Sequence, residues 1–173
     1  MGYRINARIL NIIFSVILCL ISLDGLAGQR IAVLDFELKD LTLAPGIPAE
    51  VERTASVRAM LEDELVEAGY EVVPVSSQAQ QHANAGAGYL FDHSDVAARL
   101  AKQAGADYIL VGRLHKPSFL FAYLMGHLVS ARDSQLIGNY VSEIKGSDKK
   151  LTLKGVESLA VKIDKTLKTV KQP

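Results

Sequence analysis

Apolar residues fall into two kinds of pattern after residue 29, and the two kinds alternate along the chain. Short unbroken apolar runs, typical of strands buried on both faces of a parallel sheet, occupy Arg30–Phe36, Tyr70–Val75 and Asp107–Gly112. Between the first two runs, apolar residues recur at three- and four-residue spacing, which predicts an amphipathic helix over Ala49–Ala68. This helix is expected to end at Gly69, because glycine accepts the left-handed conformation of a helix cap.

The second connection predicts two more helices. A short helix is expected to begin at Ser77 and to run into a glycine-rich loop. A better-defined helix is expected to open at Asp92, whose side chain would cap it, and to end at Gly105. Two helical crossovers between three such strands imply a parallel βαβαβ core.

The C-terminal third predicts an antiparallel hairpin and a last helix. The hairpin strands are expected over Phe119–Asp133 and Leu136–Lys145, with the turn at Ser134–Gln135, and the helix over Leu151–Lys171. The expected fold class is therefore α/β. It is a single three-layer-like domain over residues 28–173, in the order β-α-β-α-β-β-β-α, with three parallel strands followed by the hairpin and the final helix.

The N-terminal segment has the order of charge and hydropathy of a secretory signal peptide. Residues 1–8 carry positive charge, Ile9–Leu23 is an apolar run, and Gly25 and Ala27 are small. Cleavage is expected between Ala27 and Gly28, which predicts a periplasmic or secreted protein with no stable membrane span after cleavage. The alternative is an uncleaved N-terminal anchor, although the apolar run is shorter than the roughly 20 residues that span a bilayer.

The number and position of cysteines and the charge balance exclude several classes of function. The single cysteine, Cys19, lies within the apolar run behind bulky residues, which argues against lipid attachment. Cleavage would remove it, so disulfides, cysteine-ligated zinc and thiol catalysis are excluded from the mature chain. Nineteen basic and nineteen acidic residues give a balanced charge, which argues against a general nucleic-acid binder.

Several strand and turn sequences resemble known families. An opening strand like Ile31–Glu37, followed at a distance by one like Gly105–Gly112 and then by a hairpin, resembles the N-terminal domain of TolB, a plan shared by CsgG and the penicillin-binding-protein activator lipoproteins. More closely, the chain is similar to a family of predicted secreted bacterial proteins catalogued as domain of unknown function 2380. That similarity is carried by Val33–Leu38, Arg113–Ser118, Val129–Asp133 and Gly146–Asp148.

The resemblance implies a fold more than a function, because its motifs are mostly apolar strands and turns. It implies a bacterial envelope protein that works by binding another envelope or periplasmic protein. The glycine usual in the hairpin turn of the secreted family is missing beside Ser134–Gln135.

Three carboxylates follow the first strand and are the candidate chemistry of the chain. Asp35 and Glu37 are two residues apart, which predicts that both point to one face of a strand end, and Asp40 follows. Such a cluster holds a hard cation or a basic peptide, or else it serves the local structure. One alternative function is therefore a small accessory enzyme or metal-binding protein that uses this cluster with His93. No catalytic, cofactor or metal site is expected, since no hydrolase, phosphate-loop or paired-histidine motif is present.

The loop Leu38–Pro48 is long for a strand-to-helix connection and contains apolar residues. Two hypotheses explain Leu41 and Leu43: they contact a partner, or they fold back to cover the sheet edge. A second apolar segment, Phe119–Met125, is expected to form an apolar binding edge. The sequence therefore favours a non-catalytic periplasmic binding or assembly module. Its candidate partner-binding residues are Asp35, Glu37, Asp40, Leu41 and Leu43.

Overall fold

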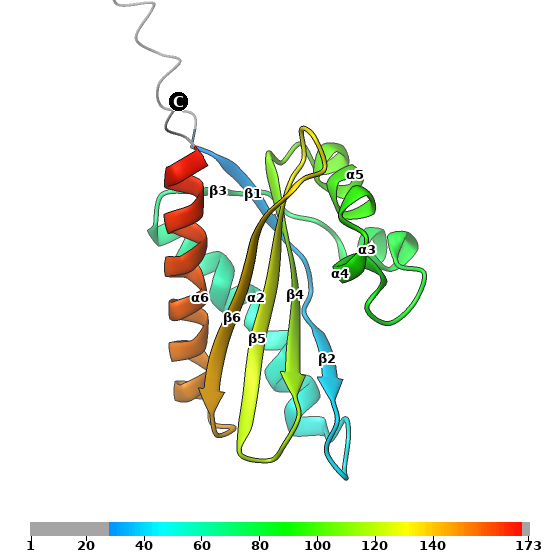
Figure 1. Ribbon diagram of the computed structural model, residues 1–173, viewed down its shortest axis with the longest axis vertical. Helices are drawn as coiled ribbons and strands as arrows, with labels where there is room; N and C mark the ends of the chain where they lie inside the picture. The colour runs from blue at the N-terminus through cyan, green and yellow to red at the C-terminus, as the bar shows by residue number, and fades with distance from the viewer. Residues whose placement is uncertain (1–27, 171–173) are drawn as a thin grey trace, which may run out of the picture.

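One six-stranded sheet organises the computed structural model, which describes residues 28–170 (Figure 1). Its strands are β1 (Arg30–Val33), β2 (Glu37–Asp40), β3 (Glu71–Val72), β4 (Tyr108–Lys116), β5 (Phe121–Ser130) and β6 (Leu136–Lys145). The strand order is β3-β1-β4-β5-β6, and β2 also pairs with β4. The first four strands are parallel, whereas β4, β5 and β6 are antiparallel neighbours. The expected count of three parallel strands is therefore wrong, and β2 is the strand that was missed.

Helices cover both faces of the sheet and make three layers. They are α2 (Pro48–Glu67), α3 (Ser77–Ala83), α4 (Tyr89–Asp92), α5 (Ser94–Ala104) and α6 (Lys149–Val170). Figure 1 shows α2 and α6 on one face and the three shorter helices on the other. Each face has its own apolar core. The single α/β domain with a last helix after a hairpin is thus confirmed.

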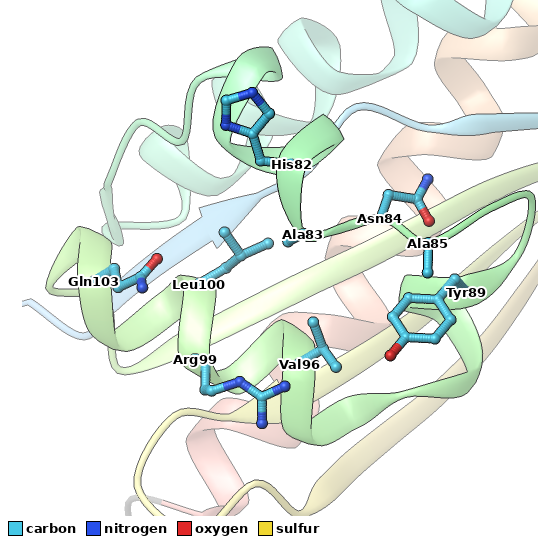
Figure 2. A pocket seen from close by; sticks show the side chains of 9 residues that line it. All are labelled: His82, Ala83, Asn84, Ala85, Tyr89, Val96, Arg99, Leu100 and Gln103. Carbon is cyan, nitrogen blue, oxygen red and sulfur yellow. The ribbon is translucent and has the colours of Figure 1, made fainter.

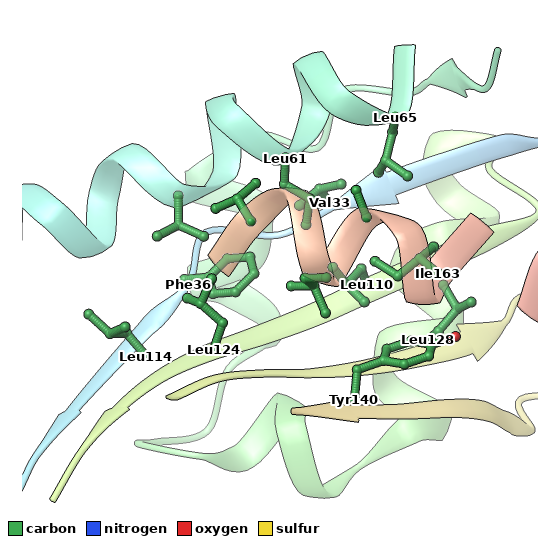
Figure 3. Packing of buried hydrophobic residues seen from close by; sticks show 14 of the residues in the cluster. Val33, Phe36, Leu61, Leu65, Leu110, Leu114, Leu124, Leu128, Tyr140 and Ile163 are labelled. Atoms are coloured by element: carbon green, nitrogen blue, oxygen red, sulfur yellow. The ribbon is translucent and has the colours of Figure 1, made fainter. Parts of the chain in front are cut away.

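The larger core lies between the sheet and the two long helices (Figure 3). Leu61 and Leu65 of α2 are fully buried there, as are Leu159 and Ile163 of α6. The apolar stripes predicted for these helices face the sheet, since the residues at three- and four-residue spacing are the buried ones. Gly69, with φ of +93°, follows α2 as expected.

The predicted first strand, Arg30–Phe36, ends at Val33, and after a break of three residues the unpredicted strand β2 begins at Glu37. β4 pairs with β1 along its first half and with β2 along its second half, in register Val33↔Leu110 and then Glu37↔Arg113. In the break, the ring of Phe36 packs directly on Gly112, where an added Cβ would lie 2.3 Å from the ring. Only glycine leaves room for this contact, which anchors the break to the middle of β4.

Three local expectations are corrected. Asp92 ends α4 and does not cap α5, whose N-cap position is His93 with no side-chain hydrogen bond. The first hairpin strand ends at Ser130, and Ser134 takes the left-handed turn conformation (φ of +61°) without a glycine. Phe119–Met125 is not a binding edge of the sheet, because β5 lies between β4 and β6.

Candidate functional site

Asp35 lies in the break between β1 and β2, where it ties two helices to the sheet. Its carboxylate accepts hydrogen bonds from Arg58 on α2 (3.1 Å) and from Ser77 on α3. Its backbone exchanges two bonds with the side-chain amide of Gln80, at 2.8 and 2.9 Å. Arg58 also pairs with Glu62 at 2.8 Å, as the spacing of the two residues predicts. Asp35 is therefore a junction residue and not part of a strand.

Glu37 holds the glycine-rich loop against the sheet. Its carboxylate accepts a hydrogen bond from the backbone N–H of Gly88 (2.9 Å) and one from Arg113 on β4 (3.3 Å). The Arg113 guanidinium in turn lies over the ring of Phe91, 4.4 Å from its centroid. Gly88 has a φ of +80°, so glycine is the residue suited to this turn.

Asp40 shapes the loop that leads into α2. Its carboxylate accepts hydrogen bonds from the Thr42 hydroxyl (2.7 Å), the Thr42 N–H (3.0 Å) and the Gly46 N–H (3.2 Å). Burial raises the pKa of Asp40, but these hydrogen bonds and the charge of Lys116 outweigh it, and the pKa is lowered overall. Asp40 thus stays ionised and holds the loop in one conformation.

The acidic cluster with His93 does not assemble into a metal site. Each carboxylate has its own partners within the chain, and the expectation that Asp35 and Glu37 share one strand face is wrong. The His93 ring bonds the Tyr89 carbonyl through Nδ1 (2.8 Å) and stacks on the Tyr89 ring. Within residues 28–170, no three histidine, cysteine, aspartate or glutamate side chains are grouped to hold an ion.

The free edge of β2 borders a groove of 450 Å³. Among the described strands β2 pairs only with β4, so its outer edge is open. The Leu41 N–H bonds Lys116 on β4, so by alternation the backbone groups of Leu38 and Asp40 face outward. The lining of the groove comes from the strand, from α2 and from the start of α3: Asp35, Phe36, Leu38, Val51, Thr54, Ala55 and Ser77.

The loop after β2 turns its leucines outward. Leu41 is 60% exposed and Leu43 is 98% exposed, so the hypothesis that they cover the sheet edge is wrong. The β4–β5 turn lies beside this loop and exposes Phe119 (59%) and Leu120 (71%). We call this surface the apolar end, and it consists of Leu41, Leu43, Ile47, Val51, Phe119, Leu120 and Phe121.

A buried group of charges lies behind the apolar end. The Glu50 carboxylate accepts hydrogen bonds from Lys116 (2.8 Å) and Arg53 (3.1 Å), and Glu50, Lys116 and Arg53 are 3%, 4% and 8% exposed. Arg53 also donates to the Thr152 hydroxyl and the Gly146 carbonyl, which joins α2 to the start of α6. The sequence analysis did not predict this group. The one indication of it in the sequence is Lys116, a lysine at the end of the long, mostly apolar strand β4.

A second hollow of 320 Å³ lies among the short helices (Figure 2). Polar side chains of His82, Asn84, Arg99 and Gln103 surround an apolar floor that includes Leu100. Arg99 is paired with Asp95 at 2.9 Å. The lining contains neither a carboxylate nor a serine.

Several solved structures share this fold at low sequence identity. PelC from Paraburkholderia phytofirmans, described as a dodecamer, matches with a TM-score of 0.54 at 13% identity, over 81% of this chain and 88% of that one. Lipoprotein GNA1162 from Neisseria meningitidis gives a TM-score of 0.51 at 17% identity, over 79% and 99% of the two chains. TolB from Acinetobacter baumannii gives 0.53 at 15% identity, over 82% of this chain and 29% of that one. The expected distant likeness to TolB is confirmed at the level of fold, over that share of its chain.

Comparison of the sequence with protein-family models identifies one family. A family model described as a protein of unknown function (DUF2380) matches residues 29–163. No curated protein matches the chain. Within residues 28–170, no helix is both long enough and apolar enough to cross a membrane.

Proposed function

We propose that this chain, which belongs to the family of proteins of unknown function (DUF2380), is a non-catalytic accessory module of the bacterial envelope that acts by binding another protein. The structures that share its fold include a lipoprotein and an assembly of twelve subunits, which supports a role in the envelope through contacts between proteins. We also propose export by the N-terminal signal, with cleavage between Ala27 and Gly28. Ala27 lies outside the described residues.

The observation that carries the binding role is the open edge of β2 beside its groove. Outward-facing backbone groups at Leu38 and Asp40 are unpaired within the sheet, and an extended segment of a partner can satisfy them by adding a strand. Phe36, Leu38 and Val51 give the groove apolar walls for one side chain of that segment. The Asp35 carboxylate at the rim is partly exposed and favours a basic residue nearby.

Among the other candidate contact residues, the carboxylates of Glu37 and Asp40 shape the rim by holding its loops. Leu41 and Leu43 stand beyond the end of the β2 edge. Because Leu41 and Leu43 lie among other exposed apolar side chains, they favour an apolar contact made by side chains and not strand addition through the backbone.

Site-specific photo-crosslinking tests this proposal in the periplasm of the source bacterium. A photoreactive phenylalanine at Ala55, in the groove, should give one discrete adduct with a partner protein. The same residue at Ala59, exposed one turn further along α2 and outside the groove lining, is the matched control. Ala55→Arg should abolish co-purification of the captured partner, whereas Ala59→Arg should preserve it. Equal adducts from both positions, or none from Ala55, would contradict a partner at this edge.

A further inference from the structure

The apolar end gathers over half of the large apolar side chains that the described surface exposes. Thirteen such residues are exposed, and seven of them lie on two neighbouring loops and the elements beside them. The loops are joined through β4, because the Leu41 N–H bonds the Lys116 carbonyl at 2.9 Å. Figure 1 shows both loops at the end of the molecule opposite to the last turn of α6. Apolar surface gathered in this way marks a contact that the chain itself does not make.

Both loops are held in shapes that keep these side chains in solvent. Asp40 fixes the first loop through Thr42 and Gly46. In the second, the Ser118 hydroxyl accepts hydrogen bonds from the N–H groups of Leu120 (3.3 Å) and Phe121 (3.2 Å). Hydrogen bonds thus present Leu43 and Leu120 outward, on projecting loops. Apolar side chains on projecting loops can be inserted into an apolar layer such as the interior of a lipid bilayer.

Lysines surround the apolar end. Lys145 lies opposite Phe121 in the β5–β6 register, Lys39 lies one residue before Asp40, and Lys149 and Lys150 begin α6; all four are exposed. Of the nearby carboxylates, Asp40 and Asp148 accept hydrogen bonds from the backbone, and Glu52 is exposed. Within residues 28–170 none of the four lysines forms an ion pair, so their ammonium groups are free to bind anions.

We propose that the apolar end binds the surface of an anionic lipid bilayer. Leu43, Phe119 and Leu120 enter the boundary between head groups and acyl chains, and the four lysines contact anionic head groups. Aliphatic and aromatic residues on projecting loops, framed by basic residues, complement this surface in both hydropathy and charge. Leu43, Phe119 and Leu120, which enter the bilayer, do not line the groove beside β2, so this contact adds to the proposed protein binding and does not depend on it.

Flotation with lipid vesicles tests the proposal directly. The protein is purified from the periplasm of cells that express the full chain and is mixed with phosphatidylglycerol–phosphatidylethanolamine vesicles or with pure phosphatidylcholine vesicles. Leu43→Ser/Phe119→Ser/Leu120→Ser should lower partitioning to the anionic vesicles by about 100-fold. Lys149→Gln/Lys150→Gln should lower it by about 30-fold. Val66→Ser/Val161→Ser, which changes exposed valines of α2 and α6, is the matched control and should leave it unchanged. Absence of binding by the wild type, or undiminished binding by the triple variant, would overturn the proposal.

The absence of tryptophan from the sequence allows a second test that does not depend on disruptive changes. Leu120→Trp and Val161→Trp each place one fluorophore at a similarly exposed position, 71% and 69% in the wild type. With anionic vesicles, emission from the Leu120→Trp protein should shift to the blue and be quenched by brominated lipids, while the Val161→Trp protein should show neither change. Unquenched emission from the Leu120→Trp protein would show that this loop does not enter the bilayer and would overturn the proposal.

Discussion

Replacing Glu50 by glutamine should destabilise the fold more than any other single change within the buried charge group. Glu50 is the only anion among the three, and it lies within 3.1 Å of Arg53 and 2.8 Å of Lys116. Glu50→Gln leaves two buried cations without a counter-charge. Breaking a buried ion pair from one side costs about 3–5 kcal/mol, because the remaining charge stays out of water without compensation.

Lys116→Met gives the contrasting result. It removes one cation and leaves Glu50 and Arg53 as a neutral pair, with Arg53 still bonded to Thr152 and Gly146. The variant loses the hydrogen bond between Lys116 and Glu50, but it no longer has to bury an ammonium group. These two effects largely cancel, so the free energy of unfolding should fall by only about 1 kcal/mol. The double variant Glu50→Gln/Lys116→Met should be more stable than Glu50→Gln alone.

Urea unfolding followed by far-ultraviolet circular dichroism measures these differences. With a slope of about 2 kcal/mol per molar urea, a loss of about 4 kcal/mol moves the midpoint down by about 2 M. The reasoning is refuted if Glu50→Gln costs less than about 1 kcal/mol, or if Lys116→Met costs as much as Glu50→Gln.

Three further predictions concern the core, the sheet and the N-terminus. Leu61→Ala, at a fully buried position, should lower the free energy of unfolding by about 2–5 kcal/mol, and an unchanged urea midpoint would mean that α2 packs with another face. Burial, with the positive charges of Lys39 and Arg113, lowers the pKa of His115 below 6.5. The folded chain then binds this proton less tightly than the unfolded chain, so stability should fall as the pH drops through about 6.5 and less so in His115→Gln, with the pKa itself read by NMR titration. N-terminal sequencing of the periplasmic protein should begin at Gly28, and an intact Met1 would point to a retained anchor.

Strongly periodic or unbroken apolar segments were predictable from the sequence. The helix stripe through Leu61 and Leu65 and the apolar run of β4 are examples, since burial alone explains both patterns. β2 was missed because Glu-Leu-Lys-Asp has no apolar run; it is a short edge strand that, among the strands the structure describes, pairs with β4 alone. β2 forms by pairing with β4, and Arg113, the residue that pairs with Glu37, lies 76 residues further along the chain.

The candidate site was predictable only in part, because the partners of its side chains are distant in sequence. Asp35 bonds Gln80 and Glu37 bonds Gly88, which are 45 and 51 residues further along. Local patterns cannot supply such pairings, so the three carboxylates looked like one cluster when they serve three separate junctions. The outward leucines of the loop were visible in the sequence, but their exposure depends on how Asp40 folds the loop.

Because β4 pairs with both β1 and β2, it also determines the order in which the sheet can form. Of the pairings among the described strands, only the two-residue contact of β1 with β3 can form before β4 exists. β4, β5 and β6 are consecutive in the chain and pair with their chain neighbours, so we expect this part of the sheet to form before the pairings of β4 with β1 and β2. A chain that emerges N-terminus first therefore stays without a completed sheet until residues 108–116 have appeared. That delay suits the export proposed for this chain, in which the chain crosses a membrane before it folds.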